Sequence, residues 1–222
     1  MQPKISFIVP CGRDFKSHGI HTVNSILHYH SMSNTEILIS SKETINNFGN
    51  VYYVPEPHSN VGAVMPINNM ACIARGEFVC VLNDDNYLRD NIEHIPDFIE
   101  SHNLVGLGLM PSYWKPGEYD PIPDCGINIP HNIHNMGFPI IKKEFITRNN
   151  QLFCSAFTHH YADCLLPLCL KVVYGQNQFI FDDDKTFIYF AGLKSIDRFS
   201  KNQYNSDYEI YKRILWNTYL NV

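Results

Sequence analysis

Residues 76–86 read GEFVCVLNDDN, and this stretch indicates the fold class of the chain. Its apolar part, residues 78–82, combines aromatic and β-branched side chains without polar alternation, as is typical of a strand buried on both faces. Asn83, Asp84 and Asp85 follow directly. In an open α/β sheet the ligand crevice lies at the carboxyl ends of the strands. We therefore expect this polar triplet to face a ligand.

The two adjacent carboxylates, Asp84 and Asp85, support two interpretations. Carboxylates at a sheet edge can bind a hard divalent cation, which commonly bridges to phosphate oxygens. That interpretation indicates nucleotide-dependent chemistry. Asp and Asn are also good turn and helix-capping residues, so the same letters can simply end a strand. The rest of the sequence has to decide between them.

Composition sets limits on the class of protein. The 222 residues are 45% hydrophobic and 18% charged, as in an ordinary globular protein with one sizeable core. The net charge is −5 and no long Lys/Arg cluster occurs, so nucleic acid and anionic membranes are not expected as principal partners. An acidic protein can still bind an anionic nucleotide when a metal supplies positive charge.

The cysteines indicate a reducing compartment. There are 7 of them, an odd number, with no C-x-x-C pair, which favours buried thiols over disulfides or a zinc site. Residues 1–10 lack the pattern of a signal peptide, and no stretch approaches the roughly 18 apolar residues of a membrane span. We expect a cytoplasmic protein without a transmembrane segment. The sequence does not indicate its oligomeric state.

The first 88 residues alternate between strand and helix patterns. Their order, β-α-β-β-α-β, is that of the first half of a doubly wound sheet. The expected strands are residues 5–9, 36–40, 51–54 and 78–82, and the expected helices are residues 20–30 and 65–75.

The remaining residues add further elements around a long loop, residues 111–135, which is rich in Pro, Gly, Asn and His. Residues 179–181 and 186–190 flank Asp182–Asp184 and predict a hairpin or a strand-turn-strand unit. No repeat or linker is visible, so we expect a single domain spanning residues 1–222. The other expected elements are strands at 104–110 and 138–141 and helices at 90–101, 143–148, 163–173 and 205–220.

Residues 51–88 resemble the donor-binding half of family-2-type glycosyltransferases with the GT-A fold. Asn60, Gly62 and Asn68 match the helix entry of that family. Residues 74–78, reading ARGEF, match its A-x-G-E-[YF] motif, which is followed by an apolar strand and a D-x-D motif. The N-terminal ISFIVP is similar to the family's opening strand, which ends in Pro at the nucleotide site. The resemblance covers about residues 4–190 and is weaker beyond residue 111.

The resemblance implies an α/β fold, a GT-A-type, mostly parallel sheet flanked by helices with a small acceptor-side subregion. Residues 1–88 would form the donor half and residues 89–222 the acceptor half with a C-terminal helix. It implies an inverting, metal-dependent transfer of one sugar from a nucleotide-diphosphate sugar, most plausibly a UDP-sugar, to a hydroxyl of a glycan or another acceptor. Mn²⁺ or Mg²⁺ would be bound by Asp85 with Asp84. The expected donor contacts are Pro10, Gly12, Arg13, Ser40, Asn60, Gly62, Asn68, Asn83 and Asp84.

Residues 157–175, FTHHYADCLLPLCLKVVYG, resemble the family's acceptor-side acidic segment. Asp163 falls on the position of the catalytic base that deprotonates the acceptor hydroxyl. A carboxylate at the start of a helix is also stabilising without any catalysis, so a capping role stays open.

Two departures from the family pattern keep other functions open. Asn83 stands where D-x-D has its first Asp, and Ser40–Ser41 stands where an Asp pair often recognises the base. These changes allow a binding module that keeps the sheet without catalysis. The alternative enzyme is a sugar nucleotidyltransferase, although residues 10–14, PCGRD, match its Gly-rich loop poorly.

Overall fold

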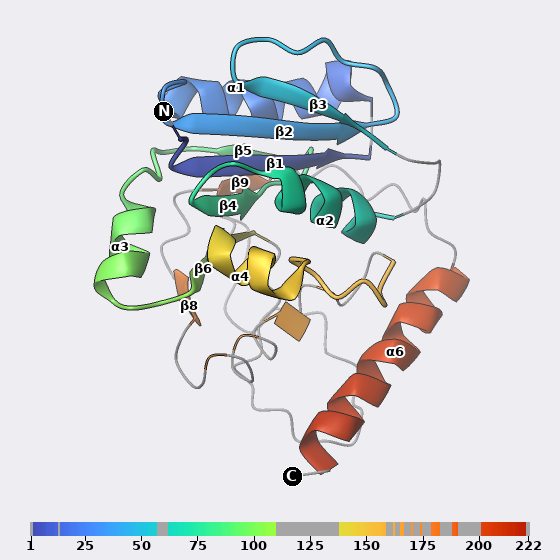
Figure 1. The fold of residues 1–222 in the computed structure, drawn as a ribbon. Coiled ribbons are helices and arrows are strands. Elements are labelled where there is room, and N and C mark those ends of the chain that lie inside the picture. The colour runs from blue at the N-terminus through green and yellow to red at the C-terminus, as the bar shows by residue number, and fades with distance from the viewer. Residues whose placement is uncertain are drawn as a thin grey trace.

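Four parallel strands form the first half of the sheet in a computed structural model of the chain. The structure describes residues 2–12, 14–56, 62–109, 138–158, 162, 165–166, 170, 174, 179–182, 188–190 and 201–220. The strands are β1 (Ile5–Cys11), β2 (Thr35–Ser41), β3 (Val51–Pro55) and β4 (Phe78–Val81). They lie in the order β3-β2-β1-β4, so the predicted doubly wound start is confirmed (Figure 1).

Three later strands extend this sheet to seven. They are β6 (Gly106–Leu109), β7 (Pro139–Lys142) and β8 (Phe179–Asp182), and the complete order is β3-β2-β1-β4-β7-β6-β8. β7 runs antiparallel to both of its neighbours, whereas β6 and β8 are parallel to each other. The sheet is therefore mixed but mostly parallel, and the predicted α/β class is confirmed.

A second, two-stranded sheet corrects one prediction. It pairs β5 (Asn86–Leu88) with β9 (Ile188–Phe190) in antiparallel orientation. Because β8 pairs with β6 and β9 with β5, these two strands do not pair with each other. Of the two predicted alternatives the hairpin is therefore wrong, whereas both flanking strands are present. The two runs are adjacent in sequence, but each finds its hydrogen-bond partner in a distant part of the chain.

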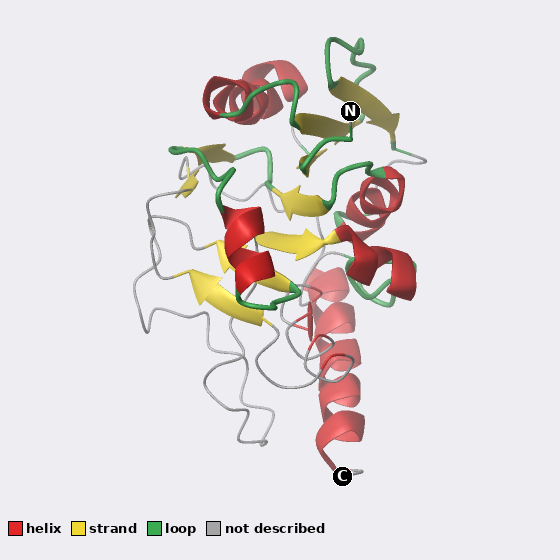
Figure 2. Ribbon diagram, turned by 60° about the vertical axis from the view of Figure 1, so that its left-hand side comes forward, coloured by secondary structure: helices red, strands yellow, loops and turns green. Residues whose placement is uncertain are grey.

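Helices cover both faces of the large sheet, as Figure 2 shows. The core on one side contains residues of α1 (Ile20–Tyr29), α3 (Ile95–Ser101) and the short π-helical turn η1 (Phe15–Gly19). The core on the other side contains residues of α2 (Val64–Ile73), α4 (Lys143–Asn149) and α6 (Lys201–Leu220). None of the helices within the described ranges is long and apolar enough to cross a membrane.

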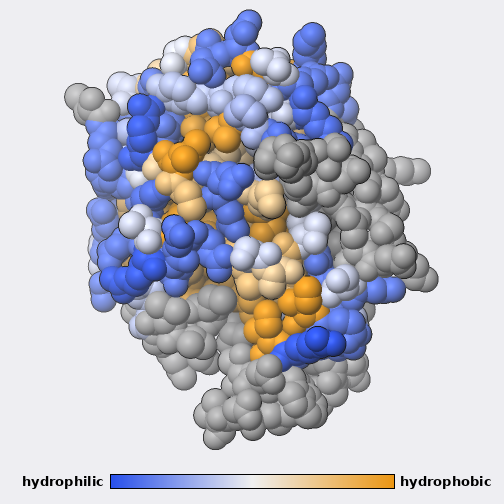
Figure 3. Space-filling model, turned by 45° about the vertical axis from the view of Figure 1, so that its right-hand side comes forward, coloured by the Kyte–Doolittle hydropathy of each residue, from blue (hydrophilic) through white to orange (hydrophobic). Residues whose placement is uncertain are grey.

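β4 is buried on both faces, as its sequence predicts. Phe78 and Cys80 belong to the core that includes α1, whereas Val79 and Val81 belong to the core that includes α2. Successive side chains of a strand point to opposite faces, so a strand between two helix layers needs apolar residues at every position. Apolar side chains also reach the surface in places between hydrophilic ones, as the face drawn in Figure 3 shows.

A buried carboxylate joins β1, β2 and the segment that leads into β4. Glu36 of β2 is 2% exposed and accepts hydrogen bonds from Ser6 Oγ, from the Arg75 backbone amide at 2.8 Å and from Arg75 Nε at 2.6 Å. The Arg75 guanidinium also lies over the Tyr52 ring, 4.8 Å from its centroid. Buried charge is tolerated when it is paired and hydrogen-bonded, as here. This network fixes where β4 begins.

Gly76 is required by the same junction. A Cβ at this position would lie 2.5 Å from the Ser6 amide nitrogen and 2.7 Å from Ser6 Oγ, and the Gly76 amide itself donates to Ser6 Oγ at 2.8 Å. Only glycine allows such a close approach to a neighbouring backbone. The Ala-x-Gly-Glu pattern seen in the sequence therefore has a packing reason in this fold.

We predict that Glu36→Ala destabilises the protein much more than Glu77→Ala. The first change removes the acceptor of three hydrogen bonds and leaves buried donors without a partner, which costs about 2–4 kcal/mol. Glu77 is a matched control, because it pairs with Lys4 at 3.0 Å on the exposed side of the same junction. Exposed pairs contribute about 1 kcal/mol or less. Urea unfolding of both variants measures the difference, and equal losses would contradict the assignment.

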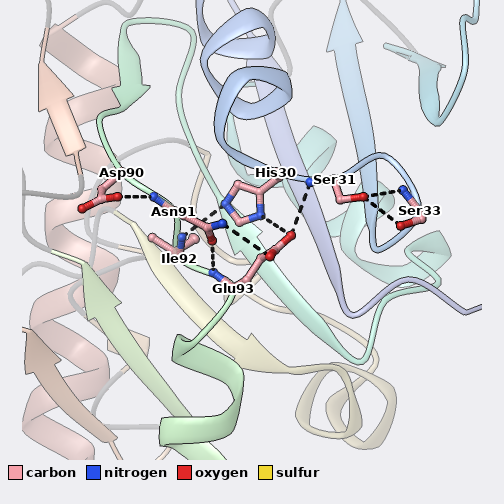
Figure 4. Close-up of polar contacts among 7 residues, drawn as sticks. All are labelled: His30, Ser31, Ser33, Asp90, Asn91, Ile92 and Glu93. Atoms are coloured by element: carbon pink, nitrogen blue, oxygen red, sulfur yellow. Dashed lines mark hydrogen bonds and ion pairs between the residues drawn. The ribbon is translucent and has the colours of Figure 1, made fainter.

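His30 is a buried, neutral histidine between α1 and the segment before α3 (Figure 4). Burial lowers its pKa from 6.5 to about 4, although the nearby Glu93 carboxylate opposes the shift. His30 Nε2 accepts a hydrogen bond from the Ile92 amide at 3.4 Å, and its ring packs edge-on against Phe7. No hydrogen-bond partner of Nδ1 lies within the described ranges, and the nearest Glu93 oxygen is 3.8 Å away.

We predict that the stability of the protein falls between pH 6.5 and pH 4 because of His30. In this window the unfolded chain binds a proton at this residue and the folded chain does not, so lower pH favours unfolding. The pKa difference between 6.5 and about 4 corresponds to roughly 3 kcal/mol over the whole window. Urea unfolding at several pH values should show a smaller pH dependence for His30→Gln than for the wild type. His28→Gln, which changes an exposed histidine of the same helix, should leave the dependence unchanged.

Candidate active site

The carboxyl ends of β1, β2 and β4 meet at one edge of the sheet. Pro10 and Cys11 of β1 lie opposite Ser40 and Ser41 of β2 in the parallel register. β4 pairs with β1 up to Ile8 opposite Val81, and the Leu82 amide still donates to the Ile8 carbonyl at 2.9 Å. Asp84 therefore follows within a few residues of the same edge, as the sequence predicts for a ligand crevice.

The segment with the two carboxylates is a turn held by α1. The Asn86 amide donates to the Asn83 carbonyl at 3.1 Å and closes the turn. Thr22 Oγ1 donates to the same Asn83 carbonyl at 3.2 Å. On the far side of the turn, Ser25 Oγ accepts a hydrogen bond from the Leu88 amide at 3.0 Å. Two side chains one helical turn apart thus fix both ends of the acidic turn.

The carboxylates themselves are buried. Asp84 is 6% exposed and Asp85 is 8% exposed. Asp84 Oδ2 accepts from Cys11 Sγ at 3.7 Å, and Asp85 Oδ1 accepts from Asn86 Nδ2 at 2.6 Å. A Cβ on Gly19 would lie 2.6 Å from Cys11 Sγ, so the glycine of η1 makes room for the thiol beside Asp84. The contacts of Cys11 with Asp84 and of Asn86 with Asp85 are not predicted from the sequence.

A divalent cation fits the chemistry of this acidic pair. Within the described ranges, no group of three or more His, Cys, Asp and Glu residues could hold a metal ion by itself. Mg²⁺ in nucleotide sites is usually held by one or two carboxylates, while substrate phosphates and water complete its coordination. Asp84 and Asp85 could supply two hard oxygen ligands of this kind. They therefore suit a metal that binds together with a phosphate ligand rather than a permanent metal centre.

Gly62 and Asn68 connect the start of α2 to residues 152–158. Gly62 has a φ of +74°, and a Cβ there would lie 2.0 Å from the Thr158 carbonyl oxygen, so glycine is required. Asn68 Oδ1 accepts from the Leu152 and Phe153 amides at 3.0 and 2.8 Å, and its Nδ2 donates to the Phe153 carbonyl. Both residues have structural roles, and their predicted contacts with a donor stay predictions.

The structure describes some of the other predicted site residues but not all of them. Pro10 is buried in β1, Gly12 is exposed just beyond it, and Ser40 is only 1% exposed. Their roles as donor contacts stay predictions. Asn83 is half-buried, and its carbonyl is used within the acidic turn. Arg13, Asn60 and Asp163 lie outside the described residues.

Known structures share this fold. TarS of S. aureus, as the 1–349 fragment, matches with a TM-score of 0.62 and 18% identity over 84% of this chain and 60% of that one. The same fragment is also known in complex with UDP and with UDP-GlcNAc. The mannosyltransferase PcManGT of Pyrobaculum calidifontis, in complex with GDP-Man and Mn²⁺, matches with a TM-score of 0.62 and 11% identity over 88% of this chain and 59% of that one.

The likeness confirms the predicted GT-A-type α/β fold. The chain spans about 60% of the length of these matched structures. A scan against protein-family models and a search of curated proteins both give no match.

Proposed function

We propose that the chain is a glycosyltransferase that uses a nucleotide-diphosphate sugar and a divalent metal ion. The observation that carries the proposal is the buried acidic turn at the carboxyl end of β4, next to the end of β1, in a GT-A-type sheet. The crevice of an open α/β sheet lies at this edge. Structures of the same fold bind UDP, UDP-GlcNAc or GDP-Man, and one of them contains Mn²⁺.

The acidic turn would act on the leaving group. When the bond between the anomeric carbon and the diphosphate breaks, negative charge develops on the phosphate oxygens. Mn²⁺ or Mg²⁺ would supply a positive charge that stabilises these oxygens. Asp85 would hold the cation directly with Asp84 beside it, and Thr22 would keep their turn in place through the Asn83 carbonyl. A UDP-sugar is the donor that we expect.

Asp163 would act on the acceptor. Its carboxylate would accept the proton of the acceptor hydroxyl while the hydroxyl oxygen bonds to the anomeric carbon. The bond to the diphosphate breaks in the same step, so the sugar moves with inversion and the nucleoside diphosphate leaves. The sequence resemblance supports this role. The Val64 amide donates to the Thr158 carbonyl at 3.3 Å and Asn68 Oδ1 accepts from the Phe153 amide at 2.8 Å, so α2 contacts residues that lie shortly before Asp163 in the sequence.

We predict that Asp85→Ala removes metal-dependent donor binding. The wild type is tested by thermal shift with UDP-, GDP- and other nucleotide sugars, each with and without Mn²⁺. At least one of these donors should raise the melting temperature, and it should do so only when Mn²⁺ is present. Donor hydrolysis by Asp85→Ala should fall by about a hundredfold or more, because the charge on the leaving group is no longer stabilised.

Asp90→Ala is the matched control, since Asp90 is exposed and only five residues away in the same segment. It should bind and hydrolyse the donor like the wild type. A wild type that no nucleotide sugar stabilises would contradict the proposed function, and binding without transfer to any acceptor would favour the binding module considered above.

We predict that Asp163→Asn separates binding from transfer. The amide keeps the size of the carboxylate but cannot accept the acceptor proton, so transfer should fall by roughly a hundred- to ten-thousand-fold. The metal-dependent thermal shift with the donor should be retained. Transfer at the wild-type rate would contradict the catalytic role of Asp163.

A further inference from the structure

Asn86 contacts Asp85 through its side chain. It is the first residue of β5 and is 1% exposed. Its Nδ2 donates to Asp85 Oδ1 at 2.6 Å, and its backbone amide closes the acidic turn on the Asn83 carbonyl. The backbone of Asn86 is paired with Phe190 of β9, so the residue is anchored on a strand while its side chain reaches Asp85.

The other polar atom of this side chain, Oδ1, is also buried. Asn86 Oδ1 has no hydrogen-bond partner within the described ranges. A buried polar atom left unpaired costs about 1–3 kcal/mol, and such an atom in a native protein calls for an explanation. Exchanging the amide oxygen and nitrogen would place two acceptor oxygens 2.6 Å apart, so the contact with Asp85 fixes the orientation of the amide.

Folding alone favours a different residue at this position. Asn is disfavoured in strands, whereas an apolar side chain of similar size would suit a buried strand position and would remove the unpaired oxygen. What an apolar side chain cannot provide is the N–H that holds Asp85 Oδ1. Within the part of the chain that the structure describes, this buried oxygen has no partner, and the amide nitrogen donates to the carboxylate that we propose as the metal ligand.

We infer that Asn86 is a positioning residue, which orients the Asp85 carboxylate toward the divalent cation of the donor complex. This inference rests on the proposed function, because it needs a cation at Asp85. Carboxylates that bind metals are commonly held by hydrogen bonds from neighbouring groups, and losing such a neighbour weakens metal affinity by about ten- to a hundredfold. Asn86 supplies this hydrogen bond as a neutral group and adds no third negative charge to the turn.

Asn86→Leu tests the inference, because leucine has a similar size and no N–H. Two quantities are measured on the full chain: the urea midpoint of unfolding, and the Mn²⁺ concentration that half-saturates binding in the presence of UDP, read from the loss of the free Mn²⁺ EPR signal. The urea midpoint should stay level or rise, since the unpaired oxygen is gone. The half-saturating Mn²⁺ concentration should rise by about tenfold or more.

Asn149→Leu is the matched control. Asn149 makes the same kind of side-chain hydrogen bond, from Nδ2 to the Phe145 carbonyl at 2.7 Å, but lies on α4. It should leave Mn²⁺ binding unchanged. Asn86→Ser, which is smaller and keeps a hydroxyl donor, covers the case in which leucine does not fit, and its Mn²⁺ affinity should fall between those of the wild type and Asn86→Ala.

The outcomes separate the two proposals. A wild type that binds no Mn²⁺ with UDP would overturn the metal-dependent function and the role of Asn86 with it. Unchanged Mn²⁺ affinity in Asn86→Leu, with normal binding by the wild type, would overturn the role of Asn86 alone. A loss of stability that accompanies the loss of Mn²⁺ affinity in both Asn86→Leu and Asn86→Ser would show that Asn86 is merely structural, and would overturn the inference as well.

Discussion

The hydrogen bonds accepted by Glu36 determine where the acidic turn lies. This buried carboxylate of β2 accepts hydrogen bonds from Ser6 of β1 and from the backbone and side chain of Arg75. It therefore links three separate segments of the chain. Gly76 then packs against Ser6, and β4 starts in register with β1. The length of β4 then determines the position of the residues that follow it. The strand ends at Val81, and Asp84 lies beside Cys11. The network lies at the amino ends of the strands, at the opposite edge from the residues that it positions.

The acidic turn itself depends on hydrogen bonds with neutral groups. Thr22 and Ser25 hold its two ends from α1, while Cys11 and Asn86 each contact one of the carboxylates. Two acidic residues next to each other repel, and burial makes this repulsion more expensive. In the proposed function, a cation would find these side chains already held in place by the protein. The π-helical turn η1 contributes through Gly19, which leaves space for the Cys11 thiol.

Much of the fold could be predicted because its signals are local. The strands at the start of the chain are apolar runs bounded by turn residues, and their observed bounds differ from the expected ones by only a few positions. The partners of β8 and β9 could not be predicted, because β8 pairs with β6 and β9 with β5, and both partners are far away in the sequence. α3 begins at Ile95 rather than near residue 90, with Pro96 in its first turn. Asp84 and Asp85 were identified correctly as residues of the sheet edge, but the contacts of Cys11 and Asn86 depend on side-chain packing that no spacing rule encodes.

The sequence by itself determined the order of strands and helices up to β4, the double-sided burial of β4 and the acidic end of that strand. These follow from periodicity and from the chemistry of single residues, which act over a few positions. Only the tertiary structure decided the antiparallel direction of β7, the small sheet of β5 and β9, and the partners of the two carboxylates. Each of these requires segments separated by tens of residues to meet at a fixed distance. Such long-range contacts form only when both faces of the sheet are packed at the same time, so they are properties of the whole fold rather than of any stretch of sequence.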